Sequence, residues 1–150
     1  MQHVATADGT QIAYSDGGQG RALVLVHGIT ESHRAWDPVI AGLQAKWRVV
    51  AVDARGHGES DRRPPYDPVT MANDVGAVVA ALNLDDPLVV GHSMGGVVVS
   101  AYGGLGLPAR GIVNVDQLLA LGSFKEALEP LIQMLQGDDA SFREIGRAHV

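Results

Sequence analysis

The sequence predicts an α/β fold, in which the strands of a largely parallel sheet alternate with helices along the chain. Short apolar runs, typical of strands buried on both faces, alternate with segments in which apolar residues recur at helical spacing. The 150 residues include 19 glycines, a number that suits many tight turns between strands and helices. Apolar residues make up 46% of the chain and charged residues 19%, which is the composition of one globular domain and excludes a disordered tail or a coiled coil.

An antiparallel hairpin is predicted at the start of the chain, followed by the first buried strand. Residues 3–7 and 11–15 flank an Asp-Gly pair, whose glycine accepts the positive φ of a tight turn. Residues 22–26 form a continuous apolar run, and we therefore expect a strand that is covered on both faces.

A helix, a strand, a loop and a second helix are expected next. The apolar residues that share a face of the first helix are Trp36, Val39, Ile40 and Leu43. Residues 49–52 are predicted to form a second buried strand, and residues 54–67 a surface loop, because glycines and prolines interrupt the latter. Thr70 is predicted to cap the second helix. The buried face of that helix carries Val75, Val78, Val79 and Leu82.

Two further buried strands are predicted at residues 87–90 and 112–115, with a helix between them. Residues 97–99 are three valines, which on their own favour a strand because branched side chains lose rotamer freedom in a helix. A helix is nevertheless required, since the chain must cross back over the sheet before another parallel strand can form. Gly103 and Gly104 are expected to end this helix in a left-handed conformation.

The most informative motif is the sequence Gly-His-Ser-Met-Gly at residues 91–95. It directly follows a predicted strand and precedes a predicted helix, the context in which a G-x-S-x-G sequence places a serine on a strained turn. The N–H groups and the positive end of the helix dipole then face any oxyanion formed at Ser93. A structural turn without chemistry and a phosphate-binding loop are the alternatives, but the latter lacks its lysine and its glycine spacing. Ser93 is therefore predicted to be the nucleophile of an acyl transfer.

Three motifs together carry a resemblance to a known family. They are His27-Gly28 after the first buried strand with Trp36 beyond it, the sequence Asp-Ala-Arg-Gly-His-Gly-Glu-Ser at residues 53–60, and the motif at residues 91–95. In this order and spacing, most of the chain resembles the amino-terminal part of the α/β-hydrolase-fold serine hydrolases, a family that includes esterases and carbon–carbon bond hydrolases.

The resemblance implies a mostly parallel sheet with flanking helices, no metal or organic cofactor, and an oxyanion hole made of two backbone N–H groups. These groups map to Ile29 and Met94, and each can lower the barrier by about 3 kcal/mol. Relatives that open epoxides or remove halides carry a carboxylate at the position of Ser93, which argues against those activities here.

The other polar residues of these motifs are expected to have structural roles. His27 is predicted to connect its loop to the sheet by hydrogen bonds rather than to act as a general base. Arg55 and His57 are expected to brace the glycine-rich loop together with Asp53, as an exposed charge cluster. His92 is expected to pack beside the nucleophile.

In this family the acid and the histidine of the triad follow the nucleophile in that order. Asp116 ends the last predicted strand and resembles the position of the acid in some relatives, although it also suits a polar strand end. His149 receives no role, because residues 145–150 match the translation of a sequencing adapter and are expected to be a non-native tail. We expect residues 1–144 to be the amino-terminal part of one domain, truncated after about its sixth strand, with a lid that begins near residue 118.

The full-length protein is therefore expected to hydrolyse small carboxylic esters, or related acyl and carbon–carbon substrates, through an acyl-enzyme on Ser93. The fragment itself is expected to be inactive, because an unassisted serine hydroxyl is a poor nucleophile. Two alternatives stay open. One is an acyltransferase or cofactor-free perhydrolase, in which another acceptor attacks the acyl-enzyme, and the other is a non-catalytic ligand-binding member of the fold.

Charge and cysteine content limit the partners. The net charge of −6 and the pI near 5.3 argue against nucleic acid or an anionic membrane, which leaves a small-molecule substrate; the oligomeric state is not predicted. The chain has no cysteine, which excludes a disulfide framework, a thiolate nucleophile and a cysteine-built zinc site. With no signal peptide or membrane-spanning run in the sequence, a cytoplasmic location is expected.

Overall fold

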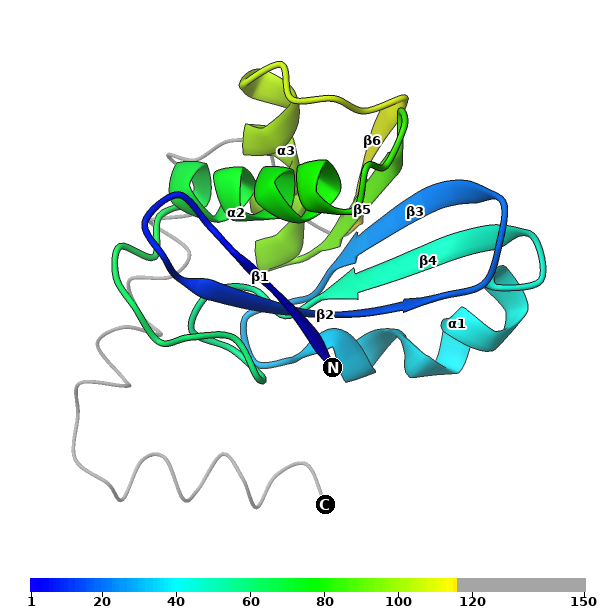
Figure 1. The fold of residues 1–150 in the computed structure, drawn as a ribbon, viewed down its shortest axis with the longest axis horizontal. Coiled ribbons are helices and arrows are strands. Elements are labelled where there is room, and N and C mark those ends of the chain that lie inside the picture. The colour runs from blue at the N-terminus through cyan, green and yellow to red at the C-terminus, as the bar shows by residue number, and fades with distance from the viewer. Residues whose placement is uncertain (116–150) are drawn as a thin grey trace. The chain divides into compact units, whose positions relative to one another are not determined.

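The structure is a computed structural model that describes residues 1–115, and these form a sheet with helices on both faces (Figure 1). The described strands are β1 (Gln2–Ala5), β2 (Gln11–Gly17), β3 (Arg21–Val26), β4 (Trp47–Val52), β5 (Leu88–His92) and β6 (Gly111–Val115). They lie side by side in the order β1-β2-β4-β3-β5-β6. β4, β3, β5 and β6 are mutually parallel, whereas β1 and β2 add an antiparallel hairpin at one edge. The predicted mostly parallel α/β architecture is therefore confirmed.

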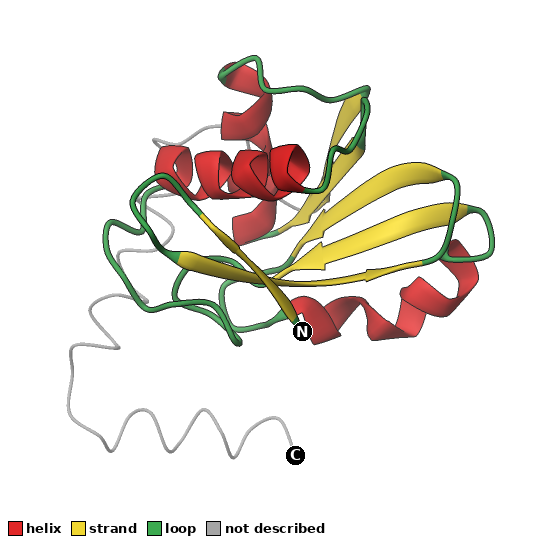
Figure 2. Ribbon diagram, viewed as in Figure 1, coloured by secondary structure: helices red, strands yellow, loops and turns green. Residues whose placement is uncertain are grey.

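The helices cover the two faces of the sheet unequally (Figure 2). The short helix η1 (His33–Trp36) and α1 (Asp37–Leu43) lie on one face, and α2 (Pro68–Ala81) and α3 (Met94–Gly104) lie on the other. None of the helices in residues 1–115 has both the length and the apolar character needed to cross a membrane.

Alternate residues of β3 supply two separate apolar cores. Val24 and Val26 belong to the larger core, which includes apolar residues of α2 and α3. Leu23 and Leu25 belong to the smaller core, against which Trp36, Ile40 and Leu43 pack. Val39, predicted to share that buried face, is exposed instead. Because successive side chains of a strand point to opposite faces, a strand covered on both faces must be apolar throughout. This explains the unbroken apolar run at β3 and confirms the expected position of the half-buried Trp36.

The cap of α2 differs from the prediction. Asp67, not Thr70, is the N-cap residue, and its Oδ1 accepts hydrogen bonds from Val69 N at 3.0 Å and Thr70 N at 2.9 Å. Thr70 lies in the first turn, where its hydroxyl donates to Asp67 Oδ2 at 2.6 Å. The physical reason is Pro68, whose fixed φ and missing N–H suit the first helical position. The cap is therefore the residue directly before Pro68.

The end of α3 also differs from the prediction. The three valines at residues 97–99 are helical as expected, but Gly103 and Gly104 stay in the helix. The left-handed residue is Gly106, with φ of 67°, whose N–H donates to Gly103 O at 3.0 Å. The predicted position of the left-handed residue was wrong by two residues, because a helix ends where its last carbonyls find new donors and not at the first available glycine.

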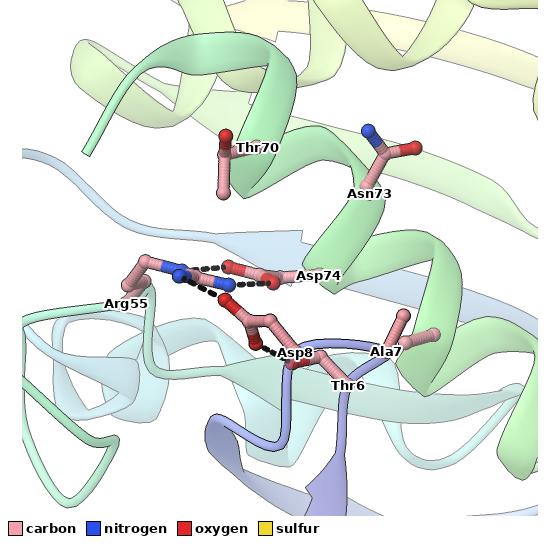
Figure 3. A pocket seen from close by; sticks show the side chains of 8 residues that line it. Thr6, Ala7, Asp8, Arg55, Thr70, Asn73 and Asp74 are labelled. Atoms are coloured by element: carbon pink, nitrogen blue, oxygen red, sulfur yellow. Dashed lines mark hydrogen bonds and ion pairs between the residues drawn. The ribbon is translucent and has the colours of Figure 1, made fainter. Parts of the chain in front are cut away.

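An arginine connects the hairpin, the long loop and α2 (Figure 3). Arg55 Nη2 and Nε donate to the two carboxylate oxygens of Asp74 at 2.7 and 2.8 Å, and Nη1 donates to Asp8 Oδ2 at 2.8 Å. The Arg55 side chain is only 2% exposed, and the pairing with Asp74 raises its pKa. The expectation of an exposed cluster with Asp53 was therefore wrong, because the guanidinium reaches the other side of the loop and finds a buried carboxylate on α2.

We predict that Arg55→Met lowers the free energy of unfolding by about 3–5 kcal/mol, because it leaves the buried Asp74 carboxylate without its partner. The control is Arg48→Met, which removes a partly exposed pair with Asp16 and should cost less than about 1 kcal/mol. Urea unfolding monitored by tryptophan fluorescence measures both. Equal losses in the two variants would contradict the structural role of Arg55, as would a failure of Arg55→Met/Asp74→Leu to recover stability.

Candidate active site

Ser93 occupies the turn between β5 and α3, where its backbone is strained. Its φ and ψ are 51° and −116°, in the left-handed half of the map that side chains other than glycine rarely adopt. The chain on both sides is fixed, since β5 ends at His92 and α3 begins at Met94, and Ser93 N donates to Val115 O at 3.0 Å. The side chain is half-buried, and its Oγ makes no hydrogen bond with any residue in the range 1–115.

The glycines of the motif allow the backbone segments to approach closely. A side chain at Gly91 would overlap the carbonyl oxygen of Gly95, and a side chain at Gly95 would overlap the carbonyl oxygen of Val26 at the end of β3. The strand, the turn and the helix can therefore pack together only with glycine at both positions.

Two backbone N–H groups, those of Ile29 and Met94, have no acceptor in the described part of the chain. Ile29 lies just beyond the end of β3, and Met94 is the first residue of α3. Both residues line one pocket of about 310 Å³. The structure thus brings Ile29 and Met94 to a common cavity, and Met94 directly follows Ser93 in the chain.

His27 sets the direction of the Ile29 N–H. Its Nδ1 donates to Gly28 O at 2.7 Å, and its Nε2 accepts from Ala54 N at 3.0 Å. In a trans peptide the carbonyl and the following N–H point in opposite directions, so the bond to Gly28 O turns the Ile29 N–H away from His27. Acting as acceptor at Nε2 requires a neutral ring, and burial lowers the pKa of His27. As expected, His27 connects this loop to the sheet.

Two further side chains hold the same loop. His57 Nε2 donates to Ile29 O at 2.7 Å. Glu31 Oε2 accepts from Gly28 N at 2.8 Å, a bond that lowers the pKa of Glu31, and lies 3.3 Å from His92 Nδ1. His92 is therefore not only a packing residue, because it connects the nucleophile turn to the loop after β3. Glu31 carries no local sequence signal, because its partner His92 lies 61 positions away.

Asp53, after β4, belongs to a separate buried network. Its Oδ1 accepts from His33 N at 2.6 Å and lies 2.9 Å from His33 Nδ1, and its Oδ2 accepts from Glu59 N at 2.9 Å. Burial would raise the pKa of Asp53, but these hydrogen bonds outweigh it and hold the pKa below its usual value. In the range 1–115 no three potential ligand side chains come together to hold a metal ion. Asp116 lies outside the described residues.

Comparisons with known proteins identify the family. The family described as "alpha/beta hydrolase fold" matches residues 21–146. The chain belongs to the α/β hydrolase fold family. It is 43% identical over 104 residues to "Non-heme haloperoxidase" of Rhodococcus erythropolis, an alignment that covers 68% of this chain and 38% of that protein. It is 34% identical over 152 residues to "Protein phosphatase methylesterase 1" of Bos taurus, covering 95% of this chain and 40% of that protein.

Solved structures agree with this membership of the α/β hydrolase fold family. The chain superposes on "esterase RhEst1 from Rhodococcus sp. ECU1013" with a TM-score of 0.80 and 32% identity, covering 92% of this chain and 55% of that one. The resemblance drawn from the three motifs is therefore confirmed, together with the fold. The chain spans about two fifths of the length of the curated relatives named above.

We predict that Gly95→Ala destabilises the protein by about 3 kcal/mol or more, because its methyl group meets the Val26 carbonyl. The matched control is Gly104→Ala at the other end of α3. Apart from its chain neighbours and the backbone of its own helix, no atom lies within 4 Å of a Cβ added at Gly104. That variant should be neutral or gain up to about 1 kcal/mol, since alanine favours the helix. Thermal melting of the two variants measures the difference, and similar melting temperatures would contradict the close packing.

A second prediction concerns pH. Because the pKa of His27 is lower in the folded than in the unfolded protein, the unfolded chain binds the proton more readily. The free energy of unfolding is therefore greatest above the unfolded pKa of about 6.5 and falls as pH drops below it. Urea midpoints at a series of pH values should show this fall, and it should be smaller in His27→Gln. His3→Gln, at an exposed histidine on β1, is the control, and an unchanged slope in His27→Gln would refute the assignment.

Proposed function

We propose that residues 1–115 are the amino-terminal part of a serine hydrolase, in which Ser93 is the nucleophile. The observation that carries the proposal is the strained turn at Ser93, directly before Met94. The N–H of Met94, like that of Ile29 in the same pocket, has no acceptor within residues 1–115. An oxyanion needs donors that are already oriented before the reaction, because reorienting them would cost part of the gain.

The proposed reaction is acyl transfer through a covalent intermediate. Ser93 Oγ attacks the carbonyl carbon of an ester while its proton passes to a general base, and the carbonyl oxygen becomes an oxyanion. The N–H groups of Ile29 and Met94 donate to this oxyanion. The intermediate then collapses, the alcohol leaves with a proton, and water releases the acid from Ser93.

The general base and its acid partner are proposed to come from outside the described residues. In the triad order of this fold both follow the nucleophile, and Asp116 is a candidate for the acid. On this proposal the 150-residue chain alone has little activity, because within residues 1–115 no histidine is hydrogen-bonded to the Ser93 hydroxyl.

Small carboxylic esters are the proposed substrates, with no metal or organic cofactor. The similarity to an esterase and to a methylesterase supports ester hydrolysis. The similarity to a non-heme haloperoxidase supports a second candidate, a perhydrolase, in which hydrogen peroxide attacks the acyl-enzyme in place of water and gives a peracid. Both candidates share Ser93 and the same acyl-enzyme.

The test uses the protein at the full length of its relatives. A fluorophosphonate probe should label Ser93, and hydrolysis of ethyl butyrate should fall at least about a thousandfold in Ser93→Ala. Ser100→Ala is the matched control, since Ser100 lies on α3 and donates to Gly96 O. Absence of labelling at Ser93 would indicate a non-catalytic binding protein. Peracid formed on addition of hydrogen peroxide would favour the perhydrolase. Turnover by the 150-residue chain above its own Ser93→Ala control would contradict the expectation that this chain alone is inactive.

A further inference from the structure

The pocket lined by Ile29 and Met94 has both apolar and charged walls. Ile29 and Met94 are the residues of the proposed oxyanion hole, Tyr66 and Met71 add largely apolar surface, and Arg62 contributes a positive charge. No carboxylate lines this pocket in the described part of the chain, although the whole chain carries a net charge of −6. A cation with apolar neighbours beside a reaction centre is a site for the anionic end of a substrate.

The charge of Arg62 is not neutralised by the neighbouring acids. Asp61 Oδ2 accepts from Gln11 N at 2.8 Å, toward the hairpin, and Asp67 is engaged in capping α2. Within residues 1–115 Arg62 forms no ion pair, whereas Arg48, Arg55 and Arg110 each do. The guanidinium is therefore available to a ligand.

The adjacent Arg63 lies elsewhere. Its guanidinium is near the hairpin turn, with Nη1 3.6 Å from the Cβ position of Gly9, and its carbonyl accepts from Arg55 Nη1 at 3.3 Å. Arg63 does not line the pocket of Ile29 and Met94. Two neighbouring residues of equal charge thus differ in whether they line the pocket of Ile29 and Met94.

We propose that Arg62 is a specificity-determining residue that favours esters carrying a carboxylate in the part of the substrate that lies in this pocket. This inference rests on the proposed function, because it assigns the substrate class of the same site. The planar guanidinium can donate two parallel hydrogen bonds to a carboxylate, while Tyr66 and Met71 contact the methylene groups between that carboxylate and the ester. The preferred substrates are monoesters of dicarboxylic acids or acyl esters of hydroxy acids.

The experiment compares anionic and neutral esters in the full-length protein. Monoethyl glutarate carries the charge on the acyl side and 3-(butyryloxy)propanoate on the alcohol side; diethyl glutarate and propyl butyrate are their neutral references. Hydrolysis of at least one anionic ester should exceed that of its reference in kcat/KM. Arg62→Gln should lower that kcat/KM about five- to tenfold, mainly through KM, and leave the neutral esters within about twofold. Added salt should weaken the preference of the unaltered protein.

Arg63→Gln is the matched control and should leave all four esters within about twofold, since it makes the same charge change outside the pocket. Equal effects of the two substitutions, or no preference for either anionic ester, would overturn the proposal. If no ester is hydrolysed, the proposed function is overturned, and the anion site at Arg62 needs a separate test. That test is phenylglyoxal modification of the 150-residue chain followed by peptide mass spectrometry. Monoethyl glutarate should protect Arg62 and not Arg63, and equal modification of both would also overturn it.

Discussion

The contact between Gly95 and the end of β3 is the constraint on which the rest of the site depends. The carbonyl oxygens of Val26 and His27 leave no space for a side chain at Gly95, so α3 begins directly against its neighbouring strand. With no loop between β5 and α3, the turn must be made within one residue, and Ser93 takes the strained conformation. Such strain persists only when the surrounding structure fixes it, and here the sheet does so on both sides.

Side-chain hydrogen bonds fix the backbone of the loop after β3. Gly28 N is bound by Glu31, Gly28 O by His27, and Ile29 O by His57, whereas the Ile29 N–H has no acceptor within residues 1–115. Its orientation is thus fixed by side chains from three different positions in the chain. A donor held in this way does not need to reorganise when negative charge develops in front of it.

What the sequence predicted correctly is local, and what it missed is long-range. The strands, the helices and the turn at Ser93 follow from apolar periodicity and from glycine spacing, which operate within a few residues. The partners of Arg55 lie 19 and 47 positions away, and the contact of Glu31 with His92 spans 61. No local pattern marks such pairs, because the fold alone decides which loops meet. The errors at Thr70 and Gly103 are local but small, since caps depend on where a helix's last polar groups find partners.

The hydrogen bonds of the described histidines support the proposal that the base comes from outside residues 1–115. Both ring nitrogens of His27 and of His57 face backbone groups, and one ring nitrogen of His33 and of His92 faces a carboxylate. Within residues 1–115 the hydrogen bonds of the histidine rings all go to partners other than the Ser93 hydroxyl. His27 cannot take a proton at Nε2 without losing the bond from Ala54 N, because that nitrogen is the acceptor. On the proposed function, residues 1–115 therefore supply the nucleophile and the oxyanion donors, and a separate, titratable group supplies proton transfer.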